Sequence, residues 1–261
     1  MSLTLRLTAD LTLALAARAL PSRNDFSPIL KFSAGAQSNA TTDSLPESDG
    51  GGANDFLQSL SSIPRYRSPI VWIDGPAPLD DSGVARLANS LVASGRHVFL
   101  ETSGASLKTR LHEFRPSSRL YLTIRLNTRR LAADPLSDHQ AALCVALEAM
   151  RMSRLAGFCT CARLIVARET HGSELEALHA EIRKLDVDGV LITPAGAEMT
   201  PEFEKQLRQW RFRFSNRRCA LLSSLLGANS LPTAPQSSLE IERPPLPDSQ
   251  QDRLGEGAEA G

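Results

Sequence analysis

The chain has 261 residues, 42% hydrophobic and 22% charged, which suffices for one large α/β domain or two small ones. Its 29 basic and 29 acidic side chains cancel and its arginines are scattered, so composition gives no reason to expect nucleic-acid binding. The four cysteines are too few and too dispersed for a disulfide framework, which predicts a reduced, cytoplasmic protein.

The N-terminal segment, residues 1–24, contains a short apolar run at residues 11–17, flanked by Asp10 and Arg18. This run is too short to span a bilayer, and the flanking charges interrupt it where a secretory signal needs a continuous apolar core. We expect an amphipathic helix that packs on the domain. Peripheral contact with a membrane surface is the alternative.

Short apolar runs alternate with helical patterns through the middle of the chain. The runs have the length of buried strands, and the patterns between them place apolar residues three and four positions apart, as in Val84, Leu87 and Leu91. The expected strands are residues 29–32, 69–73, 97–100, 119–126, 159–166 and 189–192. The expected helices begin at residue 81, 106, 137 or 138, 173 and 200.

Repeated strand–helix–strand units with short apolar strands predict an α/β fold with parallel pairing and helices covering a sheet. This pattern leaves open a doubly wound sheet and a full or partial barrel. In each of these folds, ligands bind at the carboxyl ends of the strands. The loops at those ends are residues 74–78, 101–104, 127–130, 168–172 and 193–198.

Two segments lack apolar periodicity. Residues 33–58 are rich in Ser, Gly, Thr, Asp and Asn, and are expected to form a flexible loop. Residues 227–261 hold almost no large apolar side chains, so they bury too little surface to offset the entropy of ordering and are expected to be disordered. Residues 25–226 would then form the folded domain.

Glycines and polar residues end the expected strands. Gly75, Thr102, Gly104 and Asn127 fit a nucleotide or methionine pocket, because glycine allows close backbone approach and the Thr and Asn side chains form hydrogen bonds. Ordinary turn formation after each strand explains the same residues. Both interpretations stay open.

Charged residues at the strand ends also have two interpretations. Glu101 is a candidate general acid or base, or else a solvated or arginine-paired carboxylate. Arg125, Arg129 and Arg130 would form an anion-binding rim or a solvated edge.

Two pairs of residues resemble metal ligands. Asp80 and Asp81 are adjacent, but capping of the next helix explains them better. Cys159 and Cys161 point to the same face of one strand and are better explained as small buried residues, since a pair alone is half a site. The five histidines are scattered, and none stands beside a nucleophile in a recognisable pattern.

Short motifs at the strand ends resemble those of the radical S-adenosylmethionine superfamily. Residues 73–79, IDGPAPL, are similar to its second-strand motif, an apolar residue before G-G-E-P-L. Residues 100–104, LETSG, resemble the T-N-G motif after the third strand, and residues 122–127, LTIRLN, resemble the fourth strand. Residues 187–194, VDGVLITP, resemble the sixth strand of one branch, the adenosyl-hopene transferases of hopanoid biosynthesis. The resemblance spans about residues 26–225.

The resemblance implies a six-stranded parallel partial (β/α)6 barrel. In that family, a [4Fe–4S] cluster with one open iron binds S-adenosylmethionine and cleaves it reductively to a 5′-deoxyadenosyl radical. The resemblance also implies the positions at which this cofactor would be held. These positions are Gly75, Pro76, Thr102, Gly104, Thr123 and Asn127.

The chain departs from the family at the residues that carry the chemistry. The family holds its cluster with three cysteines spaced C-x3-C-x2-C, and the matching positions here are Ser38, Thr42 and Leu45. A cluster needs soft thiolate ligands, which hydroxyl groups and a hydrocarbon side chain do not provide. Ala77 replaces the glutamate of the second-strand motif, and Pro76 replaces a glycine and removes a backbone donor.

These departures predict a degenerate radical S-adenosylmethionine-like protein that lacks the [4Fe–4S] cluster, with no catalytic or metal-binding residue to nominate. Its role would be that of a non-catalytic partner or ligand-binding relative of a hopanoid adenosyltransferase. S-adenosylmethionine stays a candidate ligand, as do another small molecule, a lipid and a protein partner. Two alternatives stay open: an active enzyme of the same fold that works without the cluster, and a product of descent that has lost its function.

Overall fold

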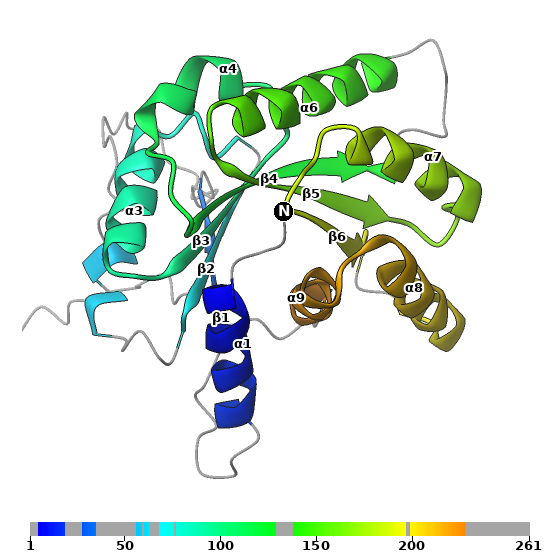
Figure 1. Ribbon diagram of the computed structural model, residues 1–261, viewed down its shortest axis with the longest axis horizontal. Coiled ribbons are helices and arrows are strands. Elements are labelled where there is room, and N and C mark those ends of the chain that lie inside the picture. Colours follow the sequence, from blue (N-terminus) through cyan, green and yellow to red (C-terminus); the bar gives the residue numbers. More distant parts are fainter. Residues whose placement is uncertain are drawn as a thin grey trace, which may run out of the picture.

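The computed structural model describes residues 5–18, 28–34, 56–58, 60–62, 68–75, 77–128, 138–196 and 199–227. Its centre is a sheet of six parallel strands in sequential order, each paired with its predecessor. The strands are β1 (Ile29–Ser33), β2 (Ile70–Asp74), β3 (His97–Thr102), β4 (Leu120–Asn127), β5 (Cys159–Val166) and β6 (Gly189–Pro194). They curl into a half-barrel (Figure 1), which confirms the predicted partial barrel. A doubly wound sheet is excluded, because its strand order would reverse.

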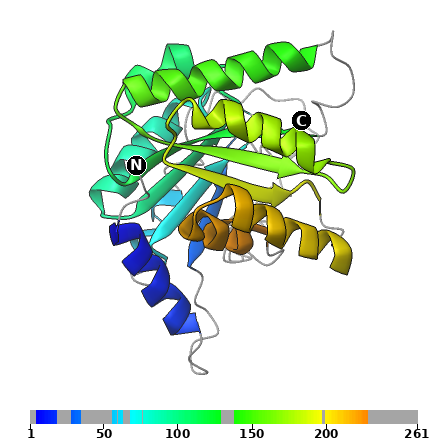
Figure 2. The ribbon, with the colours of Figure 1, turned by 45° about the vertical axis from the view of Figure 1, so that its right-hand side comes forward.

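Helices after the strands cover the outer face of the sheet. They are α3 (Ser82–Ala93), α4 (Leu107–Arg110), α6 (Asp138–Leu155), α7 (Gly172–Arg183) and α8 (Pro201–Phe214). Figures 1 and 2 show α3, α6 and α7 on the side of the sheet opposite to α1 (Leu5–Arg18) and α9 (Arg217–Gly227). Alternate strand residues, such as Val71, Leu100 and Ile124, form one apolar core with the outer helices. None of the described helices is both long enough and apolar enough to cross a bilayer.

Polar side chains fix the starts of two outer helices. Asp81 Oδ1 accepts a hydrogen bond from the Gly83 amide at 2.7 Å, ahead of α3. Thr200 Oγ1 accepts one from the Phe203 amide at 3.3 Å, ahead of α8. Each such cap contributes about 1 kcal/mol to helix stability. The capping interpretation of Asp81 is confirmed.

Most strand boundaries differ from the expected ones by no more than a single residue, and a few elements differ by more. β3 and β6 each continue two residues further than predicted, because polar residues extend the strands past their apolar cores. The single helix expected from residue 106 is a short α4 followed by a 3-10 turn, Leu111–Glu113. Most of the expected loop at residues 33–58 lies outside the described residues, but Ser33 belongs to β1 and Phe56 is buried in the outer core, so both ends of that range were assigned wrongly.

The inner face of the sheet is closed by two helices that come from opposite ends of the described chain. Leu7 and Leu11 of α1, and Leu222 and Leu226 of α9, pack on apolar residues that alternate with the outward-facing ones. No helix is predicted from the sequence at the residues of α9. The inward-facing apolar residues of the strands are Ile29, Ile70, Trp72, Phe99, Tyr121, Cys161 and Leu191.

Three aromatic rings form a stack across this inner face. The ring centroids are 5.3 Å apart for Trp72 and Phe99 and 4.5 Å apart for Phe99 and Tyr121. In both pairs the ring planes are nearly parallel. These residues sit side by side on β2, β3 and β4. The stack gives α1 and α9 a continuous apolar surface to cover.

An acidic residue ties the amino ends of β5 and β6 together. Asp188 Oδ2 accepts hydrogen bonds from the Thr160 amide and from Arg154 Nη1, both at 2.9 Å. Arg154 also contacts Asp186, at 3.3 Å. This network lies at the edge of the sheet opposite to the carboxyl ends, where a polar cluster stabilises a barrel rather than binding its ligand.

We expect Leu222→Ala to destabilise the protein by about 2 to 5 kcal/mol, because it leaves a cavity between α9 and the fully buried inner face. Urea unfolding measures this change. Leu221→Ala is the matched control, since Leu221 is the neighbouring residue on α9 and is 39% exposed. The control should change the free energy of unfolding by no more than about 0.5 kcal/mol. Equal losses for the two variants would contradict the packing of α9 on the sheet.

Candidate functional site

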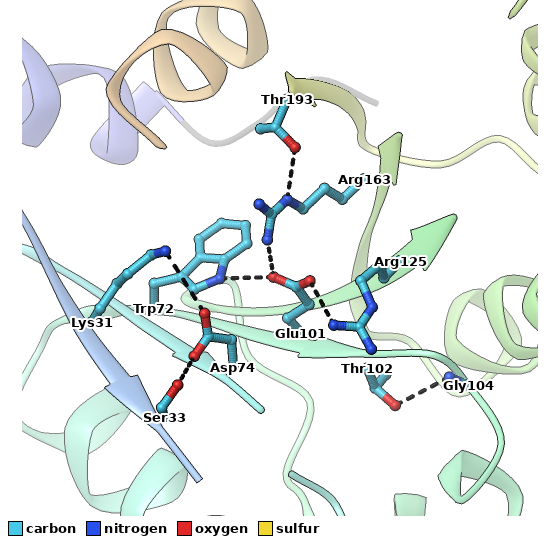
Figure 3. A network of polar contacts seen from close by, with 10 residues as sticks. All are labelled: Lys31, Ser33, Trp72, Asp74, Glu101, Thr102, Gly104, Arg125, Arg163 and Thr193. Carbon is cyan, nitrogen blue, oxygen red and sulfur yellow. Dashed lines mark hydrogen bonds and ion pairs between the residues drawn. The ribbon is translucent and has the colours of Figure 1, made fainter. Parts of the chain in front are cut away.

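The inner face changes from apolar to charged toward the carboxyl ends of the strands. Side chains two residues apart on a strand point to the same face, so the residues after the aromatic stack continue along the same inner surface. They form the polar level of the inner face, most of which Figure 3 shows. Its members are Lys31, Ser33, Asp74, Glu101, Thr123, Arg125, Arg163 and Thr193.

Glu101 is the centre of this polar level and is only 2% exposed. Its Oε2 accepts hydrogen bonds from Trp72 Nε1, at 2.9 Å, and from Arg163. Its Oε1 lies 3.7 Å from Arg125 Nη1. A buried carboxylate is tolerated only when it is paired and hydrogen-bonded, and Glu101 is both. The arginine-paired interpretation is confirmed, and the solvated one is wrong.

Arg163 connects three strands through one side chain. It contacts Glu101 on β3, donates from Nε to Thr193 Oγ1 on β6 at 3.0 Å, and lies over the Trp72 ring with its carbon 5.5 Å from the ring centroid. A planar guanidinium suits this combination of a fork of donors and an aromatic face. Arg163 therefore holds the polar level together from β2 to β6, as Figure 3 shows.

A second polar contact joins the carboxyl ends of β1 and β2. Asp74 accepts a hydrogen bond from Ser33 Oγ and lies 3.7 Å from Lys31 Nζ. Gly75 follows at φ +149°, and a Cβ there would lie 2.2 Å from the Ala34 carbonyl oxygen. Only glycine fits at this close approach of two strand ends.

Thr102 and Gly104 lie away from the polar level. Thr102 Oγ1 accepts a hydrogen bond from the Gly104 amide at 3.1 Å. Gly104 has φ +94°, and a Cβ there would lie 2.6 Å from Ala149 Cβ on α6. Both residues shape the turn after β3 and the packing of α6, and a role in holding a cofactor stays a prediction.

Thr123 and Asn127 lie on β4, on the same face as Arg125. Thr123 is 0% exposed, and among the described residues its Oγ1 has no hydrogen-bond partner. A buried hydroxyl of this kind is costly unless something satisfies it, which points to a ligand or a water. The remaining predicted positions lie outside the described residues. They are Ser38, Thr42, Leu45, Pro76, Arg129 and Arg130.

The polar level carries a surplus of positive charge. Three cations, Lys31, Arg125 and Arg163, face two carboxylates, Asp74 and Glu101. The Arg125 side chain is 33% exposed, whereas that of Arg163 is largely buried. An anionic group that reached this level would meet a guanidinium able to bind a carboxylate or phosphate with two hydrogen bonds. From the sequence, Arg125 is expected in an anion-binding rim or at a solvated edge, and neither Arg163 nor Lys31 is predicted as a site residue.

The four thiols of the chain do not fit an iron–sulfur cluster. Cys144 is exposed on α6, Cys159 and Cys161 lie near the amino end of β5, and Cys219 lies on α9. Burial raises the pKa of the Cys161 thiol well above its usual value and that of Cys219 to about 12, so neither is a ready thiolate. Among the described residues no three His, Cys, Asp or Glu side chains are grouped to hold a metal ion.

Two of the histidines, His97 and His179, lie away from the polar level. His97 opens β3 as predicted, is fully buried, and contacts Asp10 of α1 at 3.2 Å. Burial and, to a lesser extent, Arg183 lower the pKa of His179, which packs against Phe214 on the outer face. His97 thus helps to dock α1.

Comparison with known proteins adds information at the level of the fold. No family model and no curated protein matches the chain. SuiB of Streptococcus suis bound to S-adenosylmethionine aligns with a TM-score of 0.53 and 11% identity, over 73% of this chain and 49% of that chain. The fold is that of the radical S-adenosylmethionine partial barrel. SuiB bound to its precursor peptide SuiA gives the same TM-score at 10% identity, over 73% and 48% of the two chains.

Archaeal TYW1 aligns with a TM-score of 0.41 and 13% identity, over 62% of this chain and 58% of that chain. The present chain spans about half the length of the SuiB chains that it matches. The likeness to SuiB, at 10% and 11% identity, shows the shared barrel fold alone.

We expect Glu101→Leu and Arg163→Leu each to destabilise the protein by about 3 to 5 kcal/mol, since each leaves a buried charge without its main partner. The double variant should lose clearly less than the sum, because it removes both charges. Urea unfolding of the four proteins gives the coupling energy. The exposed pair Glu181 and Lys184 is the control, and Lys184→Ala should change stability by no more than about 0.5 kcal/mol. Additive losses for Glu101 and Arg163 would contradict the network.

Proposed function

We propose that this protein is a radical S-adenosylmethionine-type barrel that binds a small ligand through a carboxylate or phosphate group at the carboxyl ends of its strands and does not cleave S-adenosylmethionine reductively. The observation that carries the proposal is the polar level around Glu101, where charged side chains are buried on an inner face that is otherwise apolar. Ligands of β/α barrels bind at this edge.

The fold itself does not require these charges. Apolar residues fill the amino half of the same inner face, and buried ion pairs are on average no more stabilising than apolar side chains of similar volume. Charged side chains buried at the ligand-binding edge of a barrel are a candidate binding site. Thr123, whose hydroxyl has no hydrogen-bond partner within the described part of the chain, adds a second group suited to a polar ligand.

The chemistry of the site favours binding over catalysis. Glu101 is the strand-end carboxylate that would serve as an acid or base, but both of its oxygens face guanidinium groups and one also accepts from Trp72. The residues aligned with the family's cluster ligands are Ser38, Thr42 and Leu45, and the four cysteines of the chain lie on β5, α6 and α9. These facts support a barrel without cluster chemistry.

The connection to hopanoid biosynthesis rests on the resemblance of residues 187–194 to the adenosyl-hopene transferases. We propose that the chain is a non-catalytic relative or partner of such an enzyme. Asp188, the acidic residue of that motif, contacts Thr160 and Arg154 at the amino edge, so it supports common descent and does not belong to the site. Thr193 of the same motif accepts a hydrogen bond from Arg163 in the polar level.

Anaerobic reconstitution with iron and sulfide tests the loss of the cluster. We expect no stoichiometric cluster, because burial raises the pKa of the Cys161 and Cys219 thiols and no three ligands are grouped among the described residues. Iron and sulfide content, together with visible charge-transfer absorbance, measures uptake. Stoichiometric uptake that survives gel filtration would disprove this part of the proposal.

Thermal-shift and calorimetric titration test ligand binding. We expect S-adenosylmethionine or S-adenosylhomocysteine to raise the melting temperature more than 5′-deoxyadenosine, which lacks a carboxylate. Arg125→Ala should weaken binding about tenfold, the usual effect of losing one charged hydrogen bond. Arg86→Ala, an exposed arginine of α3, is the control and should bind normally.

Hopanoid precursors belong in the same screen because of the resemblance at the sixth strand. If none of these compounds stabilises the protein, or if Arg125→Ala and Arg86→Ala bind equally, the assignment of the polar level as the binding site is wrong.

A further inference from the structure

Helix α8 presents an unusual outward face. Its buried side packs Phe203, Leu207, Trp210 and Phe214 against the domain. Phe212 lies on the opposite side and is 90% exposed, the highest value among the large hydrophobic residues of the described chain. A phenylalanine in this position gives no stability to the fold, so its exposure needs another explanation.

Cations accompany this exposed ring. Lys205 and Arg208 precede Phe212 by seven and four residues, which places all three on one stripe of the helix. Both cations are exposed, as is Arg217 at the start of α9. The two acidic residues of α8, Glu202 and Glu204, lie in its first turn, where a negative charge complements the helix dipole.

The neighbouring arginines are committed to the fold and do not belong to the stripe. Arg211 donates to the Ile192 and Ser223 carbonyl oxygens and so ties α8 and α9 to β6. Arg213 pairs with Glu176 of α7. Helix α8 carries four basic and two acidic side chains, and α9 begins with two further arginines, so this flank has a surplus of positive charge in a chain whose net charge is zero.

The stripe lies at an accessible place in the molecule. Figures 1 and 2 show α8 beside the last strand, β6, with α9 next to it, so that α8 forms one flank of the described structure. Leu221 of α9 is also partly exposed. Phe212 is therefore an accessible apolar group with basic side chains around it on this flank.

We propose that the outward face of α8, with the start of α9, docks on an anionic phospholipid surface. Phe212 would enter the interfacial region, and the ammonium and guanidinium groups of Lys205, Arg208 and Arg217 would contact lipid phosphates. Long basic side chains suit this arrangement, because their aliphatic stems cover apolar surface while their charged heads stay among the headgroups. This inference is independent of the ligand proposed for the barrel.

A lipid surface matches the stripe better than a protein partner does. Stable protein interfaces bury about 800 Å² on each side around a core of several apolar residues. The stripe has one exposed phenylalanine with cationic side chains on either side. It is therefore a small apolar anchor surrounded by positive charge. Such an anchor suffices for reversible binding to an anionic bilayer, where each basic residue contributes about fivefold in affinity.

Vesicle flotation with the full-length chain tests the proposal. We expect binding to phosphatidylcholine vesicles that contain phosphatidylglycerol, weak or no binding to phosphatidylcholine alone, and release by salt. The double variant Lys205→Gln with Arg208→Gln should lose about 25-fold in affinity. Phe212→Ser should lose about tenfold or more, from the lost burial of one aromatic ring.

A matched control replaces one lysine and one arginine elsewhere on the surface. Lys108→Gln with Arg86→Gln removes the same charge from α3 and α4 and should bind anionic vesicles normally. Thermal melts confirm that each variant is folded. Equal binding to neutral vesicles, or unchanged binding of the Lys205 and Arg208 variant, would overturn the proposal. So would binding to poly-glutamate through the same residues without binding to vesicles, which would indicate an acidic protein partner.

Discussion

The indole of Trp72 joins the two halves of the barrel interior. Its ring stacks on Phe99 in the apolar level and lies beneath the Arg163 guanidinium, while its Nε1 donates to Glu101 in the polar level. The apolar half needs this ring because α1 and α9 pack on the stack that it begins. The polar half needs its donor because a carboxylate as buried as Glu101 must have its hydrogen bonds satisfied. One side chain therefore sets the depth at which the inner face changes from core to site.

The sequence predicted the sheet well and the inner face poorly. Parallel strands buried on both faces read as continuous apolar runs, so all six could be located. α9 was missed because its apolar residues cover an inner face that exists only once the sheet curls. Arg163 was overlooked between Cys161 and the apolar residues that follow, although an arginine inside a buried strand was itself a signal. Glu101 was identified, but its partners come from β2, β4 and β5, which no local pattern relates.

Several residues that resemble family motifs have structural tasks in this protein. Gly75 permits the close approach of β1 and β2, Gly104 admits α6, and Asp188 holds the amino ends of β5 and β6 together. The resemblance at these positions is thus explained by what the barrel needs in order to fold. The residues that would separate one chemistry from another are different ones, and they gather around Glu101. In this protein, Gly75, Gly104 and Asp188 of the family motifs are therefore needed for folding. The chemistry of the site depends on other residues.

The closure of the inner face by α1 and α9 has a consequence for folding. Each strand pairs with the strand made just before it, so the sheet can grow in the order of synthesis. The aromatic stack, however, stays uncovered until α9 has left the ribosome, because its cover comes from both ends of the folded region. During that interval Trp72, Phe99 and Tyr121 form an exposed apolar surface on a nearly complete sheet, and such a surface promotes aggregation. Folding of this barrel is therefore most exposed to aggregation, and most dependent on chaperones, just before α9 is made.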